Sequence, residues 1–385
     1  MATEQRSILV DARLNGIPGA HGLARSVMKL AEHMGRSGDG LALRILVNPS
    51  RTQLFPLAGL SERAELLGTD IRLGAVHRCR ELGQLIRDAG AAVLYVPYPL
   101  FAPLICPCPM VVTIHDCIIE GSASHAGGWH RQVGLKVATK AMLRRSAAVT
   151  APTRATLAEI RRHYPAAPNP TLIPNGIDTR PFTTVTDGAL AAARQRYGLP
   201  ERFILTVGAH RPHKNHGVLL RALAAMPADV SLVIVGYFDP NFRDKLPARI
   251  AELGLESRVR LVPEVAEEAL PAVYRAASVF AFPSVVEGFG LPVLEAMAAG
   301  VPVVASAIPA LAEVCGSAAL LVPPDDAASW ASAMSTVLGD KAAASPMIAA
   351  GTALAAAATW ETGGRALSDL LSSVAYSTSS AAAAS

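Results

Sequence analysis

The chain has 385 residues, of which 51% are apolar and 17% charged, and its 35 Lys and Arg exceed its 31 Asp and Glu by only four. This length and apolar content suit two ordinary domains and exclude a disordered or fibrous protein. An aromatic content of 5%, without a stripe of basic and aromatic residues, argues against nucleic acid as a partner.

The first predicted elements are a strand at residues 7–11, a loop containing Gly16, Gly19 and Gly22, and an amphipathic helix that extends to Met34. A glycine-rich loop between a strand and a helix allows backbone to approach a bound phosphate closely. Such a loop alone is weak evidence, so its meaning depends on the motifs further along the chain.

Residues 93–114 carry no charge and are long enough to suggest a membrane span. Five prolines between residues 97 and 109 exclude one continuous helix, so the segment predicts a strand, a proline-rich loop and a second strand at residues 110–114. His115 and Asp116 then follow the carboxyl end of a strand. From its position alone, His115 is either a buried structural residue or part of a binding site.

Residues 148–178 predict the last strands of an N-terminal domain, and residues 179–198 a linker and helix into a second domain. Residues 202–208 then form a predicted strand, and residues 209–215 a basic loop that opens a helix. Arg211 and Lys214 in that loop suit an anion such as a departing diphosphate, whereas the alternative for Lys214 is an ordinary surface lysine. His210 and His213 lack a third nearby ligand, so no metal site is predicted.

Residues 279–306 are the most informative stretch. Residues 279–282 predict a short strand buried on both faces, Gly288 and Gly290 a tight turn, and Pro292 the first position of a helix that ends at Gly300. The free amides of that helix, at residues 288–291, form an anion site at the carboxyl edge of a sheet. We therefore expect Gly288, Phe289, Gly290 and Leu291 to bind a diphosphate.

Two carboxylates accompany this turn, Glu287 before the helix and Glu295 in its second turn. Because a carboxylate accepts two hydrogen bonds from neighbouring hydroxyls, Glu295 suits a ribose diol and Glu287 a sugar or its transition state. The alternative is that the two residues form only a helix-capping and surface pair.

The stretch from Glu287 to Ser306, with Glu-Gly-Phe-Gly-Leu-Pro, a second glutamate after seven intervening residues and then Glu-Ala-Met-Ala-Ala-Gly-Val-Pro-Val-Val-Ala-Ser, resembles the signature of glycosyltransferase family 4. The resemblance implies an α/β protein of the GT-B fold, in which two Rossmann-like, doubly wound domains face each other across a cleft. It places an acceptor domain at residues 1–180, a nucleotide-sugar domain at residues 181–358 and a crossover helix at residues 359–375 that packs on the first domain. We expect residues 376–385 to be a disordered tail, because they are of low complexity.

The resemblance extends to the earlier motifs. The pattern Thr113-Ile-His115-Asp116 implies that His115 contacts the donor sugar, and Lys214 matches a family lysine. Arg211 matches less well, because the family arginine directly follows Gly208, where this chain has Ala209. In the first loop Ala24 replaces a family glycine, and Gly19 and Gly22 are expected to approach the donor phosphates or the acceptor.

The implied function is a retaining hexosyl transfer from a nucleoside diphosphate sugar to an acceptor hydroxyl. His115, Glu287, Arg211 and Lys214 are the expected catalytic residues, and Gly19, Gly22, Gly208, the 288–291 turn and Glu295 bind the donor. The resemblance to GT-B enzymes implies no metal or other cofactor. It also implies no protein base, since a leaving phosphate oxygen takes the proton of the acceptor.

The acceptor is open between a polysaccharide or lipid-linked glycan and a small secondary metabolite such as an aminocyclitol antibiotic core. Two other functions fit the same architecture: a nucleotide-sugar epimerase of the GT-B fold and a non-catalytic protein that binds sugars or nucleotides. The basic loop around Lys214 argues against the non-catalytic alternative, because binding a free sugar has no use for it.

The N-terminal sequence is too polar for a secretory signal and the five cysteines are scattered, which predicts a cytoplasmic protein. Residues 1–180 hold 21 Lys and Arg against 13 Asp and Glu. Within them Lys136, Lys140 and Arg144 recur every four residues on a predicted helix. This face either contacts anionic lipid at the inner membrane surface or is an ordinary solvated face.

Overall fold

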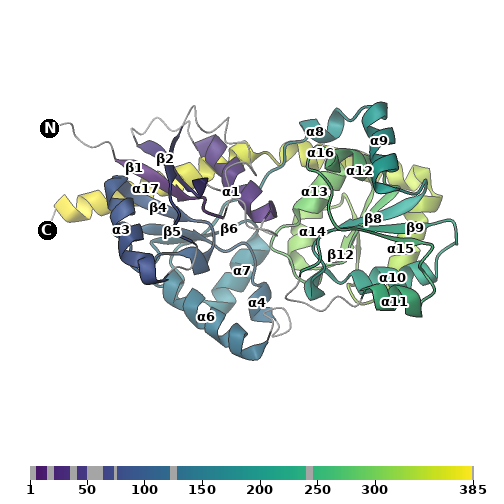
Figure 1. The fold of residues 1–385 in the computed structure, drawn as a ribbon, viewed down its shortest axis with the longest axis horizontal. Coiled ribbons are helices and arrows are strands. Elements are labelled where there is room, and N and C mark those ends of the chain that lie inside the picture. Colours follow the sequence, from purple (N-terminus) through teal and green to yellow (C-terminus); the bar gives the residue numbers. More distant parts are fainter. Residues whose placement is uncertain are drawn as a thin grey trace. The chain divides into compact units, whose positions relative to one another are not determined.

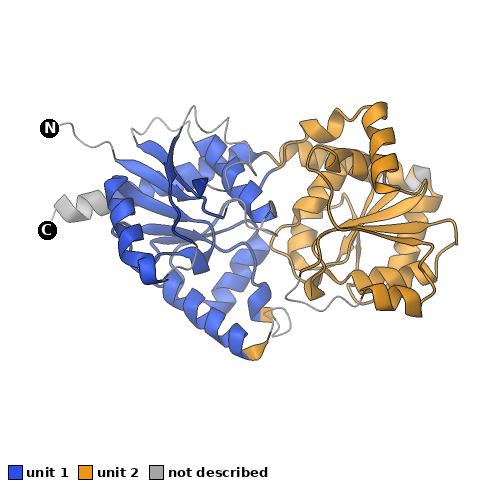
Figure 2. Ribbon diagram, in the orientation of Figure 1, with its two compact units in different colours: residues 1–120, 130–176, 360–385 blue, residues 121–129, 177–359 orange. Residues whose placement is uncertain are grey.

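The computed structural model describes residues 6–14, 21–34, 41–49, 64–72, 76–121, 128–239 and 246–383. The chain forms two compact units (Figure 2). Unit 1 contains residues 1–120, 130–176 and 360–385, and unit 2 contains residues 121–129 and 177–359. The main boundaries therefore follow residues 176 and 359, where the sequence places them after residues 180 and 358.

Unit 1 is built around a parallel sheet of seven strands in the order β3-β2-β1-β4-β5-β6-β7. The strands are β1 (Ser7–Asp11), β2 (Ala42–Val47), β3 (Glu65–Gly68), β4 (Ala91–Val96), β5 (Met110–Thr113), β6 (Ala148–Ala151) and β7 (Pro170–Leu172).

The helices of unit 1 connect these strands, and the last one returns from the end of the chain (Figure 1). They are α1 (His21–Met34), α3 (Cys79–Asp88), α4 (Ile118–Gly121), α6 (Trp129–Leu143), α7 (Arg154–His163) and α17 (Trp360–Ala383), with the 3-10 helices η2 (Val76–Arg78) and η3 (Pro99–Phe101).

Unit 2 has a parallel sheet of six strands in the order β10-β9-β8-β11-β12-β13. The strands are β8 (Phe203–Val207), β9 (Ser231–Val235), β10 (Val259–Val262), β11 (Val279–Phe282), β12 (Val303–Ser306) and β13 (Leu320–Val322).

The helices of unit 2 cover both faces of this sheet (Figure 1). They are α8 (Arg180–Thr183), α9 (Asp187–Tyr197), α10 (His216–Ala224), α11 (Leu246–Glu252), α12 (Leu270–Ala276), α13 (Leu291–Ala298), α14 (Pro309–Cys315), α15 (Ala327–Gly339) and α16 (Lys341–Ala357), with the 3-10 helix η4 (Pro212–Lys214).

Strand β11 shows why an uninterrupted apolar run forms a central strand. Phe280 and Phe282 pack into the core on the side of α12 and α13, whereas Val279 and Ala281 pack into the core on the side of α10 and α15. Because successive side chains point to opposite faces, both faces of the sheet need apolar residues. All four residues of β11 are buried, as the sequence predicts.

Both sheets have the order of a doubly wound fold, in which the winding direction reverses beside the first strand. The reversal lies between β1 and β4 in unit 1 and between β8 and β11 in unit 2. The expected α/β class with two doubly wound, Rossmann-like sheets is confirmed. Ligands of such folds bind at the carboxyl ends of the strands on either side of the reversal, so these two places are where a site is expected.

Helix α17 packs against α1 and β4 of unit 1. Its glycines allow this contact, because a Cβ on Gly363 would lie 2.1 Å from the carbonyl oxygen of Pro174, and one on Gly364 would lie 2.5 Å from the Cβ of His33. The helix extends to Ala383, whereas the sequence predicts a disordered tail from residue 376. Alanine has the highest helix propensity, and an alanine- and serine-rich segment can continue a helix that is already docked.

Residues 93–114 form β4, a loop with η3, and β5, as the prolines predict. Among the described residues no single helix is long and apolar enough to cross a membrane. One pair passes the length and composition test together, residues 327–339 with residues 344–377, and it is bent by 97°.

Candidate functional site

The loops that follow β8 and β11 meet at the point where the sheet of unit 2 reverses its winding. Strands β8 and β11 are neighbours in the sheet, and the backbone N–H of Val285 donates to the carbonyl of His213 over 2.8 Å. The basic loop and the glycine-rich turn, more than 70 residues apart in sequence, are therefore joined directly. This is the position at which doubly wound folds bind nucleotides.

Lys214 and Glu287 form an ion pair across these two loops. The Nζ atom of Lys214 lies 2.5 Å from Oε1 of Glu287 and 5.0 Å from the ring centre of Phe282. Their side chains are only 17% and 11% exposed, so the charges are held in a partly dehydrated place where electrostatic interactions are strong. Two residues that the sequence predicts as catalytic are thus in direct contact.

Gly208 leaves room for the Lys214 side chain at the end of β8. A Cβ at this position would lie 3.4 Å from both Cδ and Cε of Lys214, tighter than most contacts of real side chains. Gly236, at the end of the neighbouring β9, has a φ of +157°, and a Cβ there would lie 2.0 Å from the carbonyl oxygen of Gly208. Because these two residues lack a side chain, the backbone at the ends of β8 and β9 and the side chain of Lys214 can pack closely together.

Arg211 lies in the same loop but is turned toward β9. Its Nε donates to Asp239 over 2.8 Å and its guanidinium donates to the Tyr237 hydroxyl over 2.9 Å. Asp239 is buried, whereas the Arg211 side chain is 39% exposed. The arginine is held at one end and accessible at the other, which leaves donors for an anion.

The turn before α13 has the conformation that its glycines predict. Gly290 is the N-cap with a φ of +99°, and a Cβ there would lie 2.7 Å from a methyl of Leu311. Phe289 packs against the apolar core of unit 2, and Leu291 is the first residue of the helix. Pro292 is therefore the second helical residue, one later than expected, and its missing N–H still costs no hydrogen bond.

Glu295 is buried on α13, not exposed beside the loop. It is 6% exposed, and its Oε2 accepts a hydrogen bond of 2.7 Å from the hydroxyl of Tyr274, which is fully buried. A buried carboxylate needs such donors. The two glutamates of the motif thus differ, since Glu287 pairs with Lys214 and Glu295 is anchored by α12.

Three hydroxyls lie at the carboxyl ends of strands in unit 2. Within the described part of the chain, the hydroxyls of Thr206 on β8, Ser284 after β11 and Ser306 on β12 are buried without a hydrogen-bond partner. Buried polar atoms are nearly always paired in folded proteins. Their position at this edge of the sheet is consistent with a polar ligand or ordered water nearby.

His115 follows β5 in unit 1, at the carboxyl edge of that sheet. Burial lowers the pKa of its imidazole to about 4, although a hydrogen bond to the backbone of Pro97 acts to raise it. Among the described residues no group pairs with its buried Nε2. At neutral pH the ring is therefore uncharged and presents one nitrogen for a hydrogen bond to a neutral group.

The loop after β1, at the winding reversal of unit 1, carries a buried ion pair that the sequence analysis missed. Arg13 donates to Asp11 over 2.8 Å and 2.6 Å, and also to the carbonyl of Ile71 over 3.2 Å. Burial acts to lower the pKa of Arg13, but the charge and hydrogen bonds of Asp11 raise it overall. Both residues are almost fully buried, so this pair fixes the loop.

The two glycines predicted in the first loop are only partly placed. Gly19 lies outside the described residues. Gly22 is exposed in the first turn of α1, and a Cβ there would meet no atom within 4 Å. A close approach of the Gly22 backbone to a donor or acceptor stays a prediction.

His210 of the basic loop packs against His216, the first residue of α10. The rings of His210 and His216 are in edge-to-face contact at 5.6 Å, and burial, followed by the charges of His210 and Lys214, lowers the pKa of His216 to about 3. The described residues contain no group of three or more His, Cys, Asp or Glu side chains arranged to hold a metal ion.

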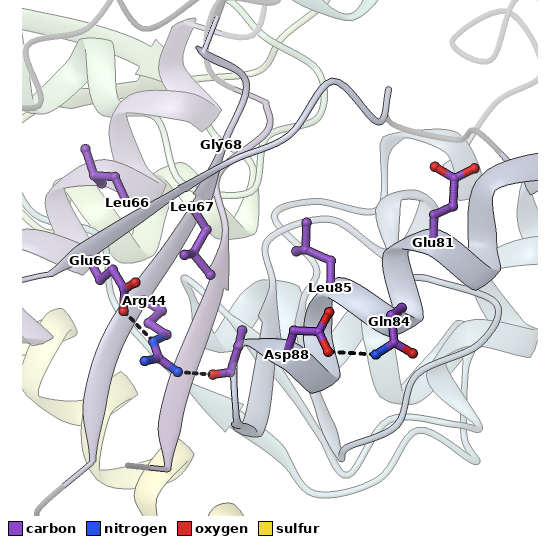
Figure 3. A pocket seen from close by; sticks show the side chains of 10 residues that line it. Arg44, Glu65, Leu66, Leu67, Gly68, Glu81, Gln84, Leu85 and Asp88 are labelled. Carbon is purple, nitrogen blue, oxygen red and sulfur yellow. Dashed lines mark hydrogen bonds and ion pairs between the residues drawn. The ribbon is translucent and has the colours of Figure 1, made fainter. Parts of the chain in front are cut away.

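A pocket of about 580 Å³ lies elsewhere, between the edge strand β3 and helix α3 of unit 1 (Figure 3). Figure 3 shows Arg44 bound to Glu65. The Arg44 guanidinium donates to Glu65 over 2.7 Å and to the carbonyl of Ala89 over 2.5 Å. None of the predicted site residues lines this pocket. Glu65 is the first residue of β3 and Arg44 lies in the amino-terminal half of β2, whereas ligand sites of this fold lie at the carboxyl ends of strands.

Three residues of the site were not found from the sequence: Tyr237, Asp239 and Tyr274. Tyr237 and Asp239 follow β9, the neighbour of β8, so their place after a buried strand was the available signal. Tyr274 lies on α12 between apolar residues and resembles any core aromatic residue in the sequence. Only its hydroxyl, directed at Glu295, distinguishes it.

Comparison with known proteins gives the same picture for both halves. A family model described as Glycosyltransferase Family 4 matches residues 20–180, and one described as Glycosyl transferases group 1 matches residues 192–353. The chain is 33% identical to a D-inositol 3-phosphate glycosyltransferase of Salinispora arenicola over 60% of this chain and 56% of that protein. It is 39% identical to O-antigen chain mannosyltransferase B of Escherichia coli over 34% and 36%. The chain thus spans about half the length or less of such curated relatives.

Solved structures resemble the whole chain. Sucrose-phosphate synthase from Thermosynechococcus elongatus has a TM-score of 0.78 and 24% identity, with 98% of this chain and 100% of that one covered. HepE of Anabaena, solved with UDP and glucose, has a TM-score of 0.76 and 22% identity, with 96% and 100% covered. The expected GT-B fold is confirmed by these likenesses, which at such identities establish the fold and not the activity.

Proposed function

We propose that this chain, which belongs to the family of glycosyl transferases group 1, moves a hexosyl group from a nucleoside diphosphate sugar to an acceptor hydroxyl with retention of configuration. The relatives named above are glycosyltransferases, and one similar structure was solved with UDP and glucose. We propose further that the reaction needs no metal ion or other cofactor.

The observation that carries the proposal is the Lys214–Glu287 pair at the winding reversal of unit 2. It lies beside the turn whose amides start α13, with Arg211 in the same loop as Lys214. A diphosphate bound there would meet one lysine, one arginine and the first turn of α13, whose backbone amides favour anions. Negative charge grows on the diphosphate as the glycosidic bond breaks, so these groups stabilise the transition state more than the bound substrate.

In the proposed reaction Lys214 exchanges part of its contact with Glu287 for the diphosphate, and Arg211 reaches the phosphates while Asp239 keeps it in place. Glu287 then faces the sugar and can accept hydrogen bonds from the sugar hydroxyls. A leaving phosphate oxygen takes the proton of the attacking acceptor hydroxyl, so no protein base is needed. Glu295, fixed by Tyr274, is the proposed partner of the ribose hydroxyls.

His115 is the proposed contribution of unit 1 to donor binding. Its uncharged ring and buried, unpartnered Nε2 suit a hydrogen bond to a sugar hydroxyl. Gly19 and Gly22 remain proposed contacts of the donor phosphates or the acceptor.

The acceptor stays open between a polysaccharide or lipid-linked glycan and a small secondary metabolite such as an aminocyclitol antibiotic core. A lipid-linked acceptor would require the protein to meet a membrane, and we propose a cytoplasmic protein with peripheral contact to the inner face.

The test is a thermal-shift and calorimetric panel of UDP, GDP, dTDP and ADP with the wild type, Lys214→Ala and Lys29→Ala. Lys29 is a matched control, since it pairs with Glu32 on the surface of α1. We expect one nucleotide to stabilise the wild type and Lys29→Ala, by about 3 kcal/mol at a hundredfold excess over its Kd, and Lys214→Ala much less. No shift with any nucleotide would remove the main support for a transferase.

The two glutamates give a finer test. Glu295→Gln should weaken binding of the selected nucleotide, because the ribose contacts are lost. Glu287→Gln should lower turnover more than nucleotide affinity. Conversion of the nucleotide sugar at full rate without any acceptor would instead indicate an epimerase, and wild-type kinetics in both variants would show that the site is wrongly assigned.

A further inference from the structure

Cys106 and Cys108 lie with their thiols in contact in the loop between β4 and β5. Their Sγ atoms are 3.8 Å apart, and both cysteines are free thiols. Each side chain packs against the apolar core of unit 1 and is otherwise partly exposed to solvent. Two neighbouring thiols that a small molecule in solution can reach are a candidate site of oxidation.

The surroundings of the two thiols are not equivalent. The hydrogen bond with the Cys108 thiol lowers the pKa of Cys106. A hydrogen bond from the Cys108 backbone and the charge of Arg145 act in the same direction, while burial opposes them. The hydrogen bond with Cys106 raises the pKa of Cys108, and burial adds to this rise. Because a thiolate is the nucleophile, Cys106 is suited to attack first, whereas Cys108 keeps its proton.

The other three cysteines differ from this pair. Cys117 and Cys315 are buried, and burial raises the pKa of both thiols. Cys79, the first residue of α3, is partly exposed like the pair. It therefore offers a matched control for an accessible single thiol.

We propose that Cys106 and Cys108 form a reversible redox site, which a small disulfide such as glutathione disulfide converts to an intramolecular disulfide. The Cys106 thiolate attacks one sulfur of the oxidant, the S–S bond of the oxidant breaks, and one glutathione leaves as a thiolate. Cys108 then gives up its proton and attacks the Cys106 sulfur of this mixed disulfide, and the second glutathione leaves. Two protein thiols and one oxidant thus give one protein disulfide and two molecules of glutathione.

The loop that carries the pair is attached to two neighbouring parts of unit 1. The guanidinium of Arg145, just beyond α6, donates to the carbonyl of Leu104. The carbonyl oxygen of Ile105 lies against Gly83 of α3, where a Cβ would be 3.4 Å from it. Oxidation brings the two sulfur atoms from 3.8 Å to bonding distance, so the loop has to move between these attachments. Because the disulfide closes a ring over one residue and stays accessible, we expect excess dithiol to reduce it readily.

The experiment incubates the full chain with glutathione disulfide, blocks the remaining thiols by alkylation and measures peptide masses. In the wild type we expect the peptide that contains residues 106 and 108 to lose two hydrogens and to carry no glutathione. Dithiothreitol should restore both thiols. Cys79→Ser should give the same result, because Cys79 takes no part in the reaction. The test uses neither nucleotide nor acceptor, so its outcome is independent of the proposed transferase activity.

Two single variants separate the attacking thiol from the second one. Cys108→Ser should stop at the mixed disulfide, seen as one glutathionyl group on residue 106, because the second thiol is missing. Cys106→Ser should react at least about tenfold more slowly, because the remaining Cys108 thiol is less ionised. Thermal unfolding of each variant beside these rates shows whether the fold is kept.

Three results would overturn the inference. The first is a wild type that keeps both thiols or holds a stable glutathione on each of them. The second is a folded Cys106→Ser variant that reacts as fast as Cys108→Ser. The third is loss of the disulfide in Cys79→Ser, which would identify a different pair of thiols.

Discussion

The two sheets share one strand order but use charge differently where their winding reverses. In unit 1 the pair Asp11–Arg13 lies at the carboxyl end of β1, is almost fully buried and is fixed to the carbonyl of Ile71. In unit 2 the pair Lys214–Glu287 joins the loops after β8 and β11, and both side chains keep some contact with solvent. The same topology thus holds a structural clamp in one unit and an accessible cation in the other.

The difference shows that a position in the fold does not by itself make a functional site. Arg13 is buried and donates to Asp11 and to the carbonyl of Ile71, so a ligand in solvent has little access to it. Lys214 has three donors and one partially exposed partner, so it can exchange partners when an anion binds. The degree of burial separates the two pairs.

The largest effect is expected from breaking the buried pair. Arg13→Met leaves the Asp11 carboxylate buried without its partner and should destabilise unit 1 by about 3–5 kcal/mol. Hydrogen exchange of the β1 and β2 amides, with urea unfolding, measures this loss. Because an apolar pair of similar volume often restores stability, Asp11→Leu with Arg13→Met should recover most of it. Equal stability of Arg13→Met and the wild type would show that the pair is no clamp.

The accessible pair should respond in the opposite way. Lys214→Met should lower the turnover of the nucleotide sugar by roughly 100- to 1000-fold, the usual loss when one donor to a developing anion is removed. Its effect on the free energy of unfolding should stay below about 1 kcal/mol, because the pair is partly solvated. Initial rates of nucleoside diphosphate release, beside urea unfolding, separate the two. A variant that unfolds easily but turns over normally would reverse the comparison.

An intermediate effect is expected within unit 2 itself. Tyr274→Phe removes the hydrogen bond to the buried Glu295 and should cost about 1–3 kcal/mol of stability. Nucleotide affinity should fall as well if Glu295 holds the ribose. Calorimetry on a folded sample checks both, and loss of stability with unchanged affinity would restrict Glu295 to a structural role.

The smallest effect concerns pH. The pKa of His115 is about 4 in the folded protein and about 6.5 in the unfolded chain, so between these values the unfolded state binds more protons and stability rises with pH. For wild-type unit 1 this contributes up to about 1 kcal/mol per pH unit, which His115→Gln should remove. His216, whose pKa is about 3, keeps the corresponding dependence in unit 2. Parallel pH profiles of variant and wild type would contradict the assignment.

The motif around Glu287 made the most accurate predictions because each of its residues has a local physical requirement. An apolar run forms β11, Gly290 takes a positive φ, and Leu291–Ala298 forms the helix. Such requirements can be read from neighbours in the chain. The contact between Lys214 and Glu287 was not predicted, because it depends on β8 and β11 being neighbours in the sheet.

Other features lie beyond local pattern. The buried Glu295 accepts its hydrogen bond from Tyr274, 21 residues away in the sequence. Arg211 is held by its ion pair with Asp239, 28 residues away. The sequence gives no signal for the pairing of Glu295 with Tyr274, and for Asp239 it gives only the place of this residue after a buried strand. The helical end of α17 was missed for a different reason, since composition alone does not reveal that Leu367, Leu371 and Ala375 are buried against unit 1.

Helix α17 also determines which unit can fold first during synthesis. Arg6 donates to the carbonyl of Ala375 over 2.9 Å, so the first strand and the last helix complete one unit across 369 residues. Residues 177–359 can collapse while the ribosome is still synthesising the chain, whereas unit 1 waits for its final helix to emerge. Until then the face of α1 that α17 covers is exposed to solvent. Truncation of the chain within α17 would therefore destabilise unit 1, although most of unit 1 is translated before unit 2.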